Sequence, residues 1–441
     1  MRALLINPWI YDFKCHDFWI KPHGFLRIAS MLKNNGFAID FIDCMDRFDP
    51  DMKDYKIKDD EYGKGKFFYE EIEKPDVYSK IPRKYKRYGT LVSIFKNKLE
   101  KLQKPDVILI TSSMTYNYEG VFYAIDLLKE KFENVKIVLG GIYATLCNDH
   151  AKKRSKADFV WKGRVNDTFF KLLKHYTGKD IICDENINEV LPDYSFYKNV
   201  PYAAVRFTFG CPFNCTYCAV KSFNDDYYQR DVQNIIYELK KYYESGISDV
   251  AFYDDALLYK NFYVKSILRK IIKEKLKFHF HTPNGLHASY VDADMAELLK
   301  ESGFVDLRIS LETSDYELQK KTGGKVTDEN FMQSVKNLKN AGFKGSDIGV
   351  YILAGLPHQK YDSVLKDVHY LMDKKVKIKI ANYSPIPGTV DFLELREDIR
   401  AQIAAEPLKQ NELYFLTINN DFTWEDNEKI KKMVNDHNHS L

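Results

Sequence analysis

The chain has 441 residues, of which 45% are hydrophobic and 29% charged, and its formal net charge is +3 at pH 7. This is the composition of a globular protein that buries its cores without disulfides, and the length suggests roughly three domains. The near-neutral charge makes no case for binding nucleic acid or an anionic membrane, and no apolar run approaches the ~20 residues of a membrane span.

Residues 1–180 alternate apolar strands with amphipathic helices, which is typical of a Rossmann-like parallel sheet covered on both faces. Five strands are expected, at residues 2–7, 38–43, 106–111, 136–139 and 158–162. Helices are expected between them, at residues 24–34, 120–132 and 166–176. The first strand breaks too soon for a signal peptide, so we expect a reduced cytoplasmic setting, which clustered thiols need.

Gly140 and Gly141 follow the fourth strand and open a helix. Glycines there let a ligand approach the backbone at the carboxyl end of a strand, although they also serve simply to make a tight turn. A charged, tyrosine-rich insertion at residues 44–104 interrupts the pattern and is expected to carry a helix at 90–102. Its basic run at 81–89 is expected to be a solvated face.

After a linker at residues 181–200, the strand and helix pattern resumes and continues to residue 395. Strands are expected at 203–209, 249–253, 277–281, 306–311, 347–353 and 377–383. Helices are expected at 231–244, 262–274, 293–301, 328–340 and 361–373. Six such units predict a partial (β/α)6 barrel, whose active site lies at the carboxyl ends of its strands. Residues 396–441 are expected to form a helical C-terminal extension.

Cys211, Cys215 and Cys218 lie in one loop after the first barrel strand, whereas Cys15, Cys44, Cys147 and Cys183 are scattered. A cubane iron–sulfur cluster normally takes four cysteines, so three would leave one iron open, as in reactive metal sites. The alternatives are a zinc site, a redox disulfide or three buried free thiols. Zinc would need a fourth ligand, and His279, His281 and His287 are distant in sequence.

The run Cys-x-x-x-Cys-x-Tyr-Cys resembles the signature of the radical S-adenosylmethionine (SAM) superfamily. In that family the three cysteines hold a [4Fe–4S] cluster, and the open iron binds SAM. The resemblance implies that Asp254 and Asp255 receive the amino group of SAM and that Glu312 binds its ribose. It also implies that Tyr217 and Leu353 pack on the adenine. Asn284, beside the third strand, is a further candidate contact, although any of these residues is also suited to a cap or turn.

The N-terminal half resembles the cobalamin-binding domain found before many radical SAM domains. The residues that carry this resemblance are the segment 22–32, Gly36, Asp43, Ser112, Ser113, Gly140 and Gly141. The resemblance implies that Gly140 and Gly141 contact cobalamin. His16 and His23 do not match the Asp-x-His-x-x-Gly motif that supplies a cobalt ligand, so we expect no histidine ligand.

Together the resemblances imply an enzyme that cleaves SAM to a 5′-deoxyadenosyl radical and, with cobalamin, transfers a methyl group to an unactivated carbon. Without cobalamin, rearrangement or dehydrogenation would be expected. An alternative of a different functional class is a non-catalytic iron–sulfur electron carrier or redox sensor. Methylthiolation of tRNA is not expected, because the N-terminal cysteines form no second cluster site. An electron donor such as a flavodoxin or ferredoxin is the expected partner, while the substrate and the catalytic residues are not assigned.

Overall fold

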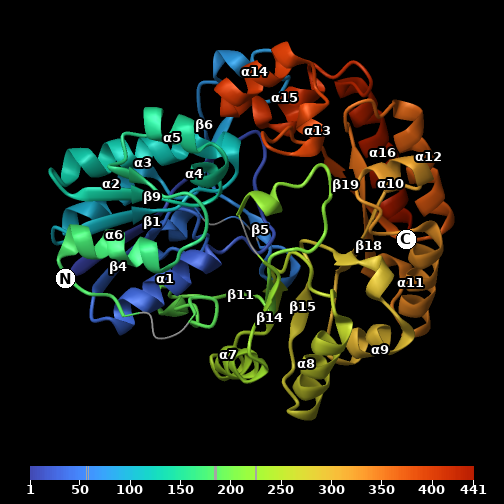
Figure 1. Cartoon of the computed structure of the whole chain (residues 1–441), viewed down its shortest axis with the longest axis horizontal. Helices are drawn as coiled ribbons and strands as arrows, with labels where there is room; N and C mark the ends of the chain where they lie inside the picture. The colour runs from blue at the N-terminus through green and yellow to red at the C-terminus, as the bar shows by residue number, and fades with distance from the viewer. Residues whose placement is uncertain (56, 58, 183–185, 224–225) are drawn as a thin grey trace. The chain divides into compact units, whose positions relative to one another are not determined.

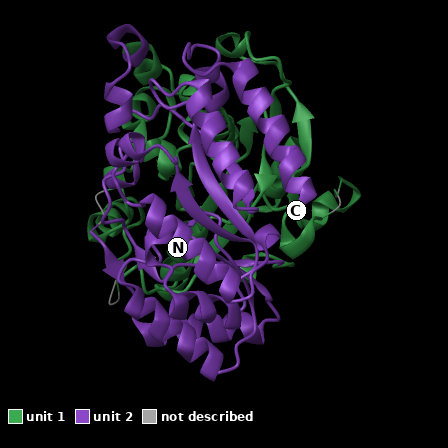
Figure 2. Ribbon diagram, turned by 90° about the vertical axis from the view of Figure 1, so that its right-hand side faces the viewer, with its two compact units in different colours: residues 1–200, 222–224, 401–410 green, residues 201–221, 225–400, 411–441 purple. Residues whose placement is uncertain are grey.

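The computed structural model describes residues 1–441 except residues 56, 58, 183–185 and 224–225. The chain divides into two compact units, coloured separately in Figure 2, and each is described by itself. Unit 1 contains residues 1–200, 222–224 and 401–410, and unit 2 contains residues 201–221, 225–400 and 411–441. The segment expected to form one C-terminal extension is therefore divided between the two units.

Unit 1 is built on a five-stranded parallel sheet with the strand order β10-β9-β8-β1-β4. Figure 1 labels β1, β4 and β9 of this sheet. The strands are β1 (Arg2–Asn7), β4 (Ala38–Asp43), β8 (Val107–Ile110), β9 (Lys136–Leu139) and β10 (Phe159–Val160). All five expected strands are present. The order reverses between β1 and β8, and in open α/β sheets such a reversal leaves a crevice where ligands bind.

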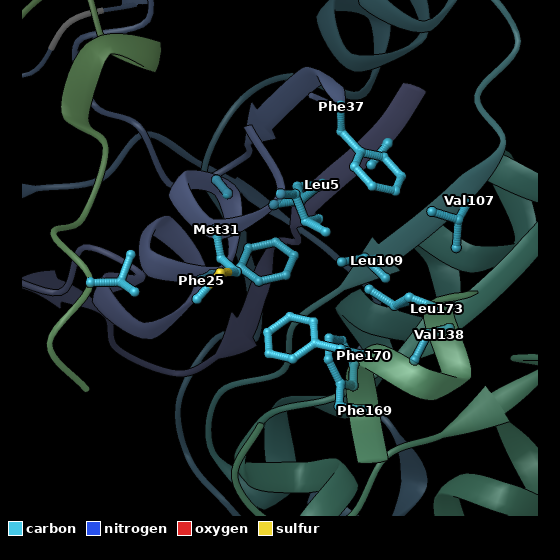
Figure 3. Close-up of a cluster of buried hydrophobic side chains, with 14 residues drawn as sticks. Leu5, Phe25, Met31, Phe37, Val107, Leu109, Val138, Phe169, Phe170 and Leu173 are labelled. Atoms are coloured by element: carbon cyan, nitrogen blue, oxygen red, sulfur yellow. The ribbon is translucent and has the colours of Figure 1, made fainter. Parts of the chain in front are cut away.

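Helices cover this sheet. They are α1 (His23–Asn34), α2 (Val92–Lys101), α3 (Tyr118–Lys131), α4 (Ile142–Leu146), α5 (Asn148–Arg154) and α6 (Asp167–Thr177). Figure 3 shows α1 and α6 packing apolar side chains on one face of the sheet. Leu5 and Leu109 of the strands meet Phe25 of α1 and Phe170 of α6 there. Fully burying such a side chain contributes about 1.5–3 kcal/mol, so this core holds both helices on the sheet.

The insertion within unit 1 contains short antiparallel strands as well as the expected helix α2. Its strands β6 (Tyr69–Glu71) and β7 (Lys86–Tyr88) form a sheet of order β2-β7-β6 with β2 (Ile10–Asp12), which precedes the insertion. Its strand β5 (Gly65–Lys66) pairs with β3 (His16–Asp17), which also precedes the insertion. In the basic run, Arg87 pairs with Glu70 at 2.6 Å. These strands were not predicted from the sequence, because two or three residues are too few to reveal an alternating pattern.

Unit 2 contains the parallel strands of the expected partial barrel, in two hydrogen-bonded sheets of order β11-β14-β15 and β16-β17-β18-β19. They are β11 (Ala203–Val205), β14 (Asp249–Phe252), β15 (His279–His281), β16 (Leu286–His287), β17 (Leu307–Glu312), β18 (Ile348–Ala354) and β19 (Lys377–Asn382). The α/β fold class is confirmed.

Two strand predictions need correction. The first strand ends at Val205, and a separate strand β12 (Thr208–Phe209) turns away to pair antiparallel with β13 (Tyr228–Gln229). The third strand is followed by a second segment, β16, which pairs with β17 instead of β14. Pro283 lies between β15 and β16 and has no N–H to donate, which explains why the strand does not run on.

The helices of unit 2 follow the strands nearly as expected. They are α7 (Val232–Glu244), α8 (Asn261–Lys273), α9 (Ala293–Glu301), α10 (Tyr316–Lys321), α11 (Asp328–Asn340), α12 (Tyr361–Asp373), α13 (Val390–Leu393), α15 (Glu412–Leu416) and α16 (Trp424–Ser440). A further helix, α14 (Glu397–Ala405), continues from unit 2 into unit 1. In the described part of the chain, no helix is long and apolar enough to cross a membrane.

The C-terminal helix α16 covers the edge of the last strand. Asn438 accepts a hydrogen bond from the Ile378 backbone N–H at 2.8 Å and donates one to the Ile378 carbonyl at 2.9 Å. The side-chain amide therefore replaces a neighbouring strand at β19, which leaves this edge protected from pairing with another chain.

Candidate functional site

The three clustered cysteines lie in the loop after β12, and each is partly buried. The backbone N–H of Cys218 donates to the carbonyl of Cys215 at 3.1 Å, which folds the second half of the loop into a turn. Burial raises the pKa of Cys211 and raises that of Cys218 to about 11, and neighbouring thiols add to both effects. The thiols therefore lie close enough to influence one another and need a metal centre to hold them as thiolates.

This donor set suits a cubane cluster. Within the described residues, no three His, Cys, Asp or Glu side chains converge closely enough to hold a single metal ion. The cysteine ligands of a cubane each bind a different iron atom, so they lie further apart than the ligands of one ion. Three soft thiolate donors on one loop fit an iron–sulfur cluster.

A buried ion pair borders the cysteine loop. Lys325 Nζ lies 2.6 Å from Glu312 Oε1, both side chains are 11% exposed, and the lysine also donates to the Tyr217 hydroxyl at 3.2 Å. Burial acts to lower the pKa of Lys325, but Glu312 and the cysteine thiols raise it above its ordinary value. Lys325 therefore stays charged, and its positive charge favours the thiolate forms of Cys211 and Cys218.

The sequence analysis missed Lys325, which lies in the loop after α10. Gly323 in the same loop packs so closely on the cysteine loop that a Cβ there would lie 3.2 Å from Cys215 Cα. The paired glycines Gly323 and Gly324, followed by a lysine, were the available signal. Glycines at such a turn indicate a close backbone approach, and here both have positive φ angles.

Glu312 is held in an uncommon backbone conformation. Its φ is +69°, in the left-handed region, and the pairing of β17 with β18 shifts register between Ser310 and Glu312. For a residue with a Cβ this costs about 1–2 kcal/mol, and such strain concentrates at functional sites. The register shift occurs at the end of β17, where the Glu312 carboxylate lies against Lys325 and the contact to the cofactor is predicted.

The two predicted aspartates lie in different environments. Asp254 is fully buried, and its Oδ1 accepts hydrogen bonds from the backbone N–H groups of Phe207 and Thr208, at 3.0 and 2.6 Å, and from the Thr208 hydroxyl at 2.7 Å. It thus ties the end of β14 to the segment that leads into the cysteine loop. Asp255 is partly exposed, pairs with Arg206 at 3.3 Å and acts electrostatically on Cys211.

Asn284 adjoins the same strand end, where its amide donates to the Asp254 carbonyl at 3.2 Å. Of these three candidates, Asp255 is the one whose carboxylate acts on a cysteine of the loop. Asp255 is therefore the better candidate to pair with an ammonium group, since the Asp254 carboxylate is already engaged by backbone N–H groups. The role of each residue in binding SAM stays a prediction.

The two residues predicted to pack on adenine belong to one apolar cluster. Leu353 is buried with Leu356, Tyr383 and Phe415, and Tyr217 packs against this group. Tyr217 reaches this cluster from the cysteine loop, while Leu353 reaches it from β18. The structure thus brings the aromatic and aliphatic candidates together, at one side of the cysteines.

Gly140 and Gly141 lie in unit 1 at the carboxyl end of β9 and have different surroundings. A Cβ on Gly141, whose φ is +98°, would lie 2.3 Å from the Ser112 carbonyl oxygen, so only glycine fits there. A Cβ on Gly140 would meet nothing within 4 Å. Gly141 therefore closes the turn, while Gly140 presents bare backbone to open space, as a ligand-facing glycine does.

Comparison with known families agrees with this organisation. Residues 205–371 match the model of the Radical SAM superfamily, and residues 95–173 match that of the B12 binding domain. The chain is therefore a radical SAM enzyme that also carries a B12-binding domain. Its cofactors are accordingly a [4Fe–4S] cluster, SAM and cobalamin, and the resemblance seen in the sequence is confirmed.

Individual relatives are distant. An uncharacterized methyltransferase of Pyrococcus horikoshii is 24% identical over 327 residues, covering 66% of this chain and 70% of its own. The ribosomal protein methylthiotransferase RimO of Clostridium botulinum is 22% identical over 348 residues, covering 76% and 71%.

Two solved structures share the fold. The radical SAM methyltransferase TsrM of Kitasatospora setae, with cobalamin and a [4Fe–4S] cluster bound, has a TM-score of 0.67 at 15% identity and covers 90% of this chain and 78% of its own. The cobalamin-dependent radical enzyme OxsB, with aqua-cobalamin and SAM bound, has a TM-score of 0.56 at 14% identity and covers 94% and 56%.

Proposed function

We propose that this enzyme transfers a methyl group to an unactivated carbon of its substrate, using cobalamin together with SAM and the cluster. The observation that carries the proposal is that one chain combines a B12-binding domain with a radical SAM domain. Cobalamin supplies a methyl carrier, and SAM cleaved at the cluster supplies the radical that activates the carbon.

The chain's own residues have defined tasks in this proposal. Cys211, Cys215 and Cys218 would hold the [4Fe–4S] cluster, which would supply an open iron position to bind SAM. Asp255 pairs with the amino group of SAM, since a carboxylate facing an ammonium gives a charge-assisted hydrogen bond. Asp254 positions the cysteine loop through Phe207 and Thr208.

The remaining contacts to SAM involve the ribose and the base. Glu312, with its paired Lys325, accepts hydrogen bonds from the ribose hydroxyls. Tyr217 and Leu353 pack on the adenine and exclude water from the reacting atoms, which keeps a radical from side reactions.

Unit 1 would hold cobalamin at the carboxyl edge of its sheet, near the reversal between β1 and β8. The open space above Gly140 gives a nucleotide-like tail access to the backbone. Both histidines near the first strand are otherwise engaged. His16 Nε2 lies 2.8 Å from Asp60, and His23 Nε2 accepts a hydrogen bond from Arg27 Nε at 3.2 Å. We therefore propose that cobalt receives no histidine ligand from this chain.

A methylthiotransferase is the second candidate, because RimO is among the relatives. That reaction would need a second cluster site in the N-terminal half. Cys44 and Cys147 are each buried in unit 1, and Cys147 lies 3.6 Å from the amide of Gln410. Cys183 lies outside the described residues. Methyl transfer remains the function we favour.

The test begins with the anaerobically reconstituted protein. After incubation with hydroxocobalamin and desalting, about one equivalent of corrinoid should be retained, with a visible spectrum unaltered by His16→Ala or His23→Ala. With a reductant such as reduced flavodoxin, SAM should then be converted to both 5′-deoxyadenosine and S-adenosylhomocysteine. Formation of S-adenosylhomocysteine should require cobalamin. Retention of no corrinoid would refute methyl transfer and favour rearrangement or dehydrogenation.

A further inference from the structure

His287 is a buried histidine whose Nδ1 has no hydrogen-bond partner in the described part of the chain. The residue is only 6% exposed, and Nδ1 itself is inaccessible. Burial, together with the charge of Lys325, lowers its pKa to about 3, so the imidazole is neutral at physiological pH. Buried polar atoms in proteins are nearly always paired, so an unpaired one calls for an explanation.

The buried histidines His281 and His23 are tied to charged groups through their Nε2 atoms. His281 Nε2 lies 2.9 Å from Asp249, and His23 accepts a hydrogen bond from Arg27. His287 instead has aromatic neighbours. Its ring meets that of Phe213 at 4.4 Å between centroids and 66° between planes, and it stacks near Tyr290. These rings pack on the imidazole, and neither of them forms a hydrogen bond with Nδ1.

His287 contacts the cysteine loop and also feels the charge of the Lys325 ammonium, which is paired with Glu312. Phe213, against which it packs, is inside the loop between Cys211 and Cys215. The charge of Lys325, which holds Glu312 at 2.6 Å, acts on the imidazole. His287 is therefore a candidate contact for a molecule that chelates the cluster and also reaches Glu312.

Strand pairing adds a second polar group on the same face. In the parallel pair of β16 and β17, His287 lies opposite Ser310, and residues in register direct their side chains to the same side of a sheet. Ser310 is itself buried and precedes Glu312 by two positions along β17. An imidazole and a hydroxyl thus stand side by side next to the predicted ribose contact.

We propose that the uncharged side chains of His287 and the neighbouring Ser310 line the SAM-binding site and form hydrogen bonds with bound SAM. This inference rests on the proposed function, since it assumes that SAM binds between the cluster and Glu312. Uncharged side chains suit the hydroxyl groups of the nucleoside, because those hydroxyl groups are uncharged as well. Bound SAM would supply the missing partner of the imidazole.

Two substitutions separate hydrogen bonding from packing. His287→Phe keeps an aromatic ring against Phe213 but removes both nitrogens, whereas His287→Asn keeps a polar group near the position of Nδ1 and loses the ring. His279→Phe on β15 is the matched control, since that histidine is half exposed. The readout is the dissociation constant for SAM, measured by equilibrium dialysis on the anaerobically reconstituted protein, together with iron content and melting temperature.

Loss of one neutral hydrogen bond weakens binding about five- to tenfold. We expect that loss of affinity for His287→Phe, with unchanged iron content, and affinities within about twofold of the natural protein for His287→Asn and His279→Phe. Ser310→Ala, which removes only a hydroxyl, should weaken SAM binding about threefold and provides a test if a His287 variant fails to fold.

The outcomes are distinguishable. A natural protein that holds no cluster or binds no SAM would overturn the proposed function and this inference with it. If the natural protein binds SAM and both His287→Phe and Ser310→Ala bind it equally well, only the inference is overturned. A His287→Asn variant that binds SAM as weakly as His287→Phe and melts earlier would also overturn it, because packing would then be the role of the ring.

Discussion

Asp254→Asn should remove a pH dependence of stability from this protein. The Asp254 carboxyl is fully buried, and burial raises its pKa from an ordinary value of 3.8 to about 7, against the opposing effects of Thr208 and Arg206. Asparagine has nearly the same shape, and its Oδ1 can accept the same bonds from Phe207 and Thr208. The substitution therefore removes the titration while keeping the anchor of the cysteine loop.

The sign of this pH dependence follows because the folded protein holds the Asp254 proton more tightly than the unfolded chain does. Between pH 4 and pH 7 the folded carboxyl keeps its proton while the unfolded one has lost it, so stability falls as the pH rises and levels off above 7. Each unit of pKa difference is worth about 1.36 kcal/mol, so the full loss is roughly 4 kcal/mol. About 2 kcal/mol of it falls between pH 5.5 and pH 8.5.

The assay is denaturant unfolding of the natural protein and the Asp254→Asn variant at these two pH values, in parallel. Subtracting the variant from the natural protein cancels every other titrating group. Between pH 5.5 and pH 8.5 the free energy of unfolding should fall by about 2 kcal/mol more in the natural protein than in the variant. Asp255→Asn is the control, because that carboxyl is partly exposed and paired with Arg206. Equal pH slopes for the natural protein and Asp254→Asn would refute the derivation.

Three further predictions concern the cofactors. Cys211→Ala should abolish the cluster, measured as bound iron and sulfide, while Cys183→Ala should leave it intact; a full complement of iron in the first variant would contradict the ligand assignment. Glu312→Gln should weaken SAM binding at least about tenfold, since a hydrogen bond to a charged group is worth about 1.5–3 kcal/mol, and unchanged affinity would remove Glu312 from the site. Gly140→Leu should fold normally but retain less cobalamin after desalting, whereas Gly141→Ala should lower the melting temperature, because only the second position is crowded by backbone.

The sequence alone predicted much of this protein, because its signals are local. Alternating apolar strands and amphipathic helices predicted the sheet of unit 1 and the strands and helices of the partial barrel. The three cysteines of one loop, which span eight residues, indicated the radical SAM domain. Such patterns are readable because hydrophobic periodicity and ligand spacing are properties of short stretches of chain.

Site details that depend on distant residues were not predictable in this way. The break between β11 and β12 arises because Asp254, 46 residues beyond Thr208, takes up backbone N–H groups there. The glycine pair before Lys325 indicates a close backbone approach, but only folding brings the Lys325 ammonium to Glu312.

The environment of each candidate was likewise decided by the tertiary structure. In sequence Asp254 and Asp255 are adjacent and look equivalent, but folding buries the first against backbone and leaves the second partly exposed and paired with Arg206. His279, His281 and His287 looked alike too, yet only folding gives His281 a carboxylate partner and surrounds His287 with aromatic rings. The sequence determined which chemical groups are present. The fold decided which of them are paired, because pairing depends on distances between residues far apart in the chain.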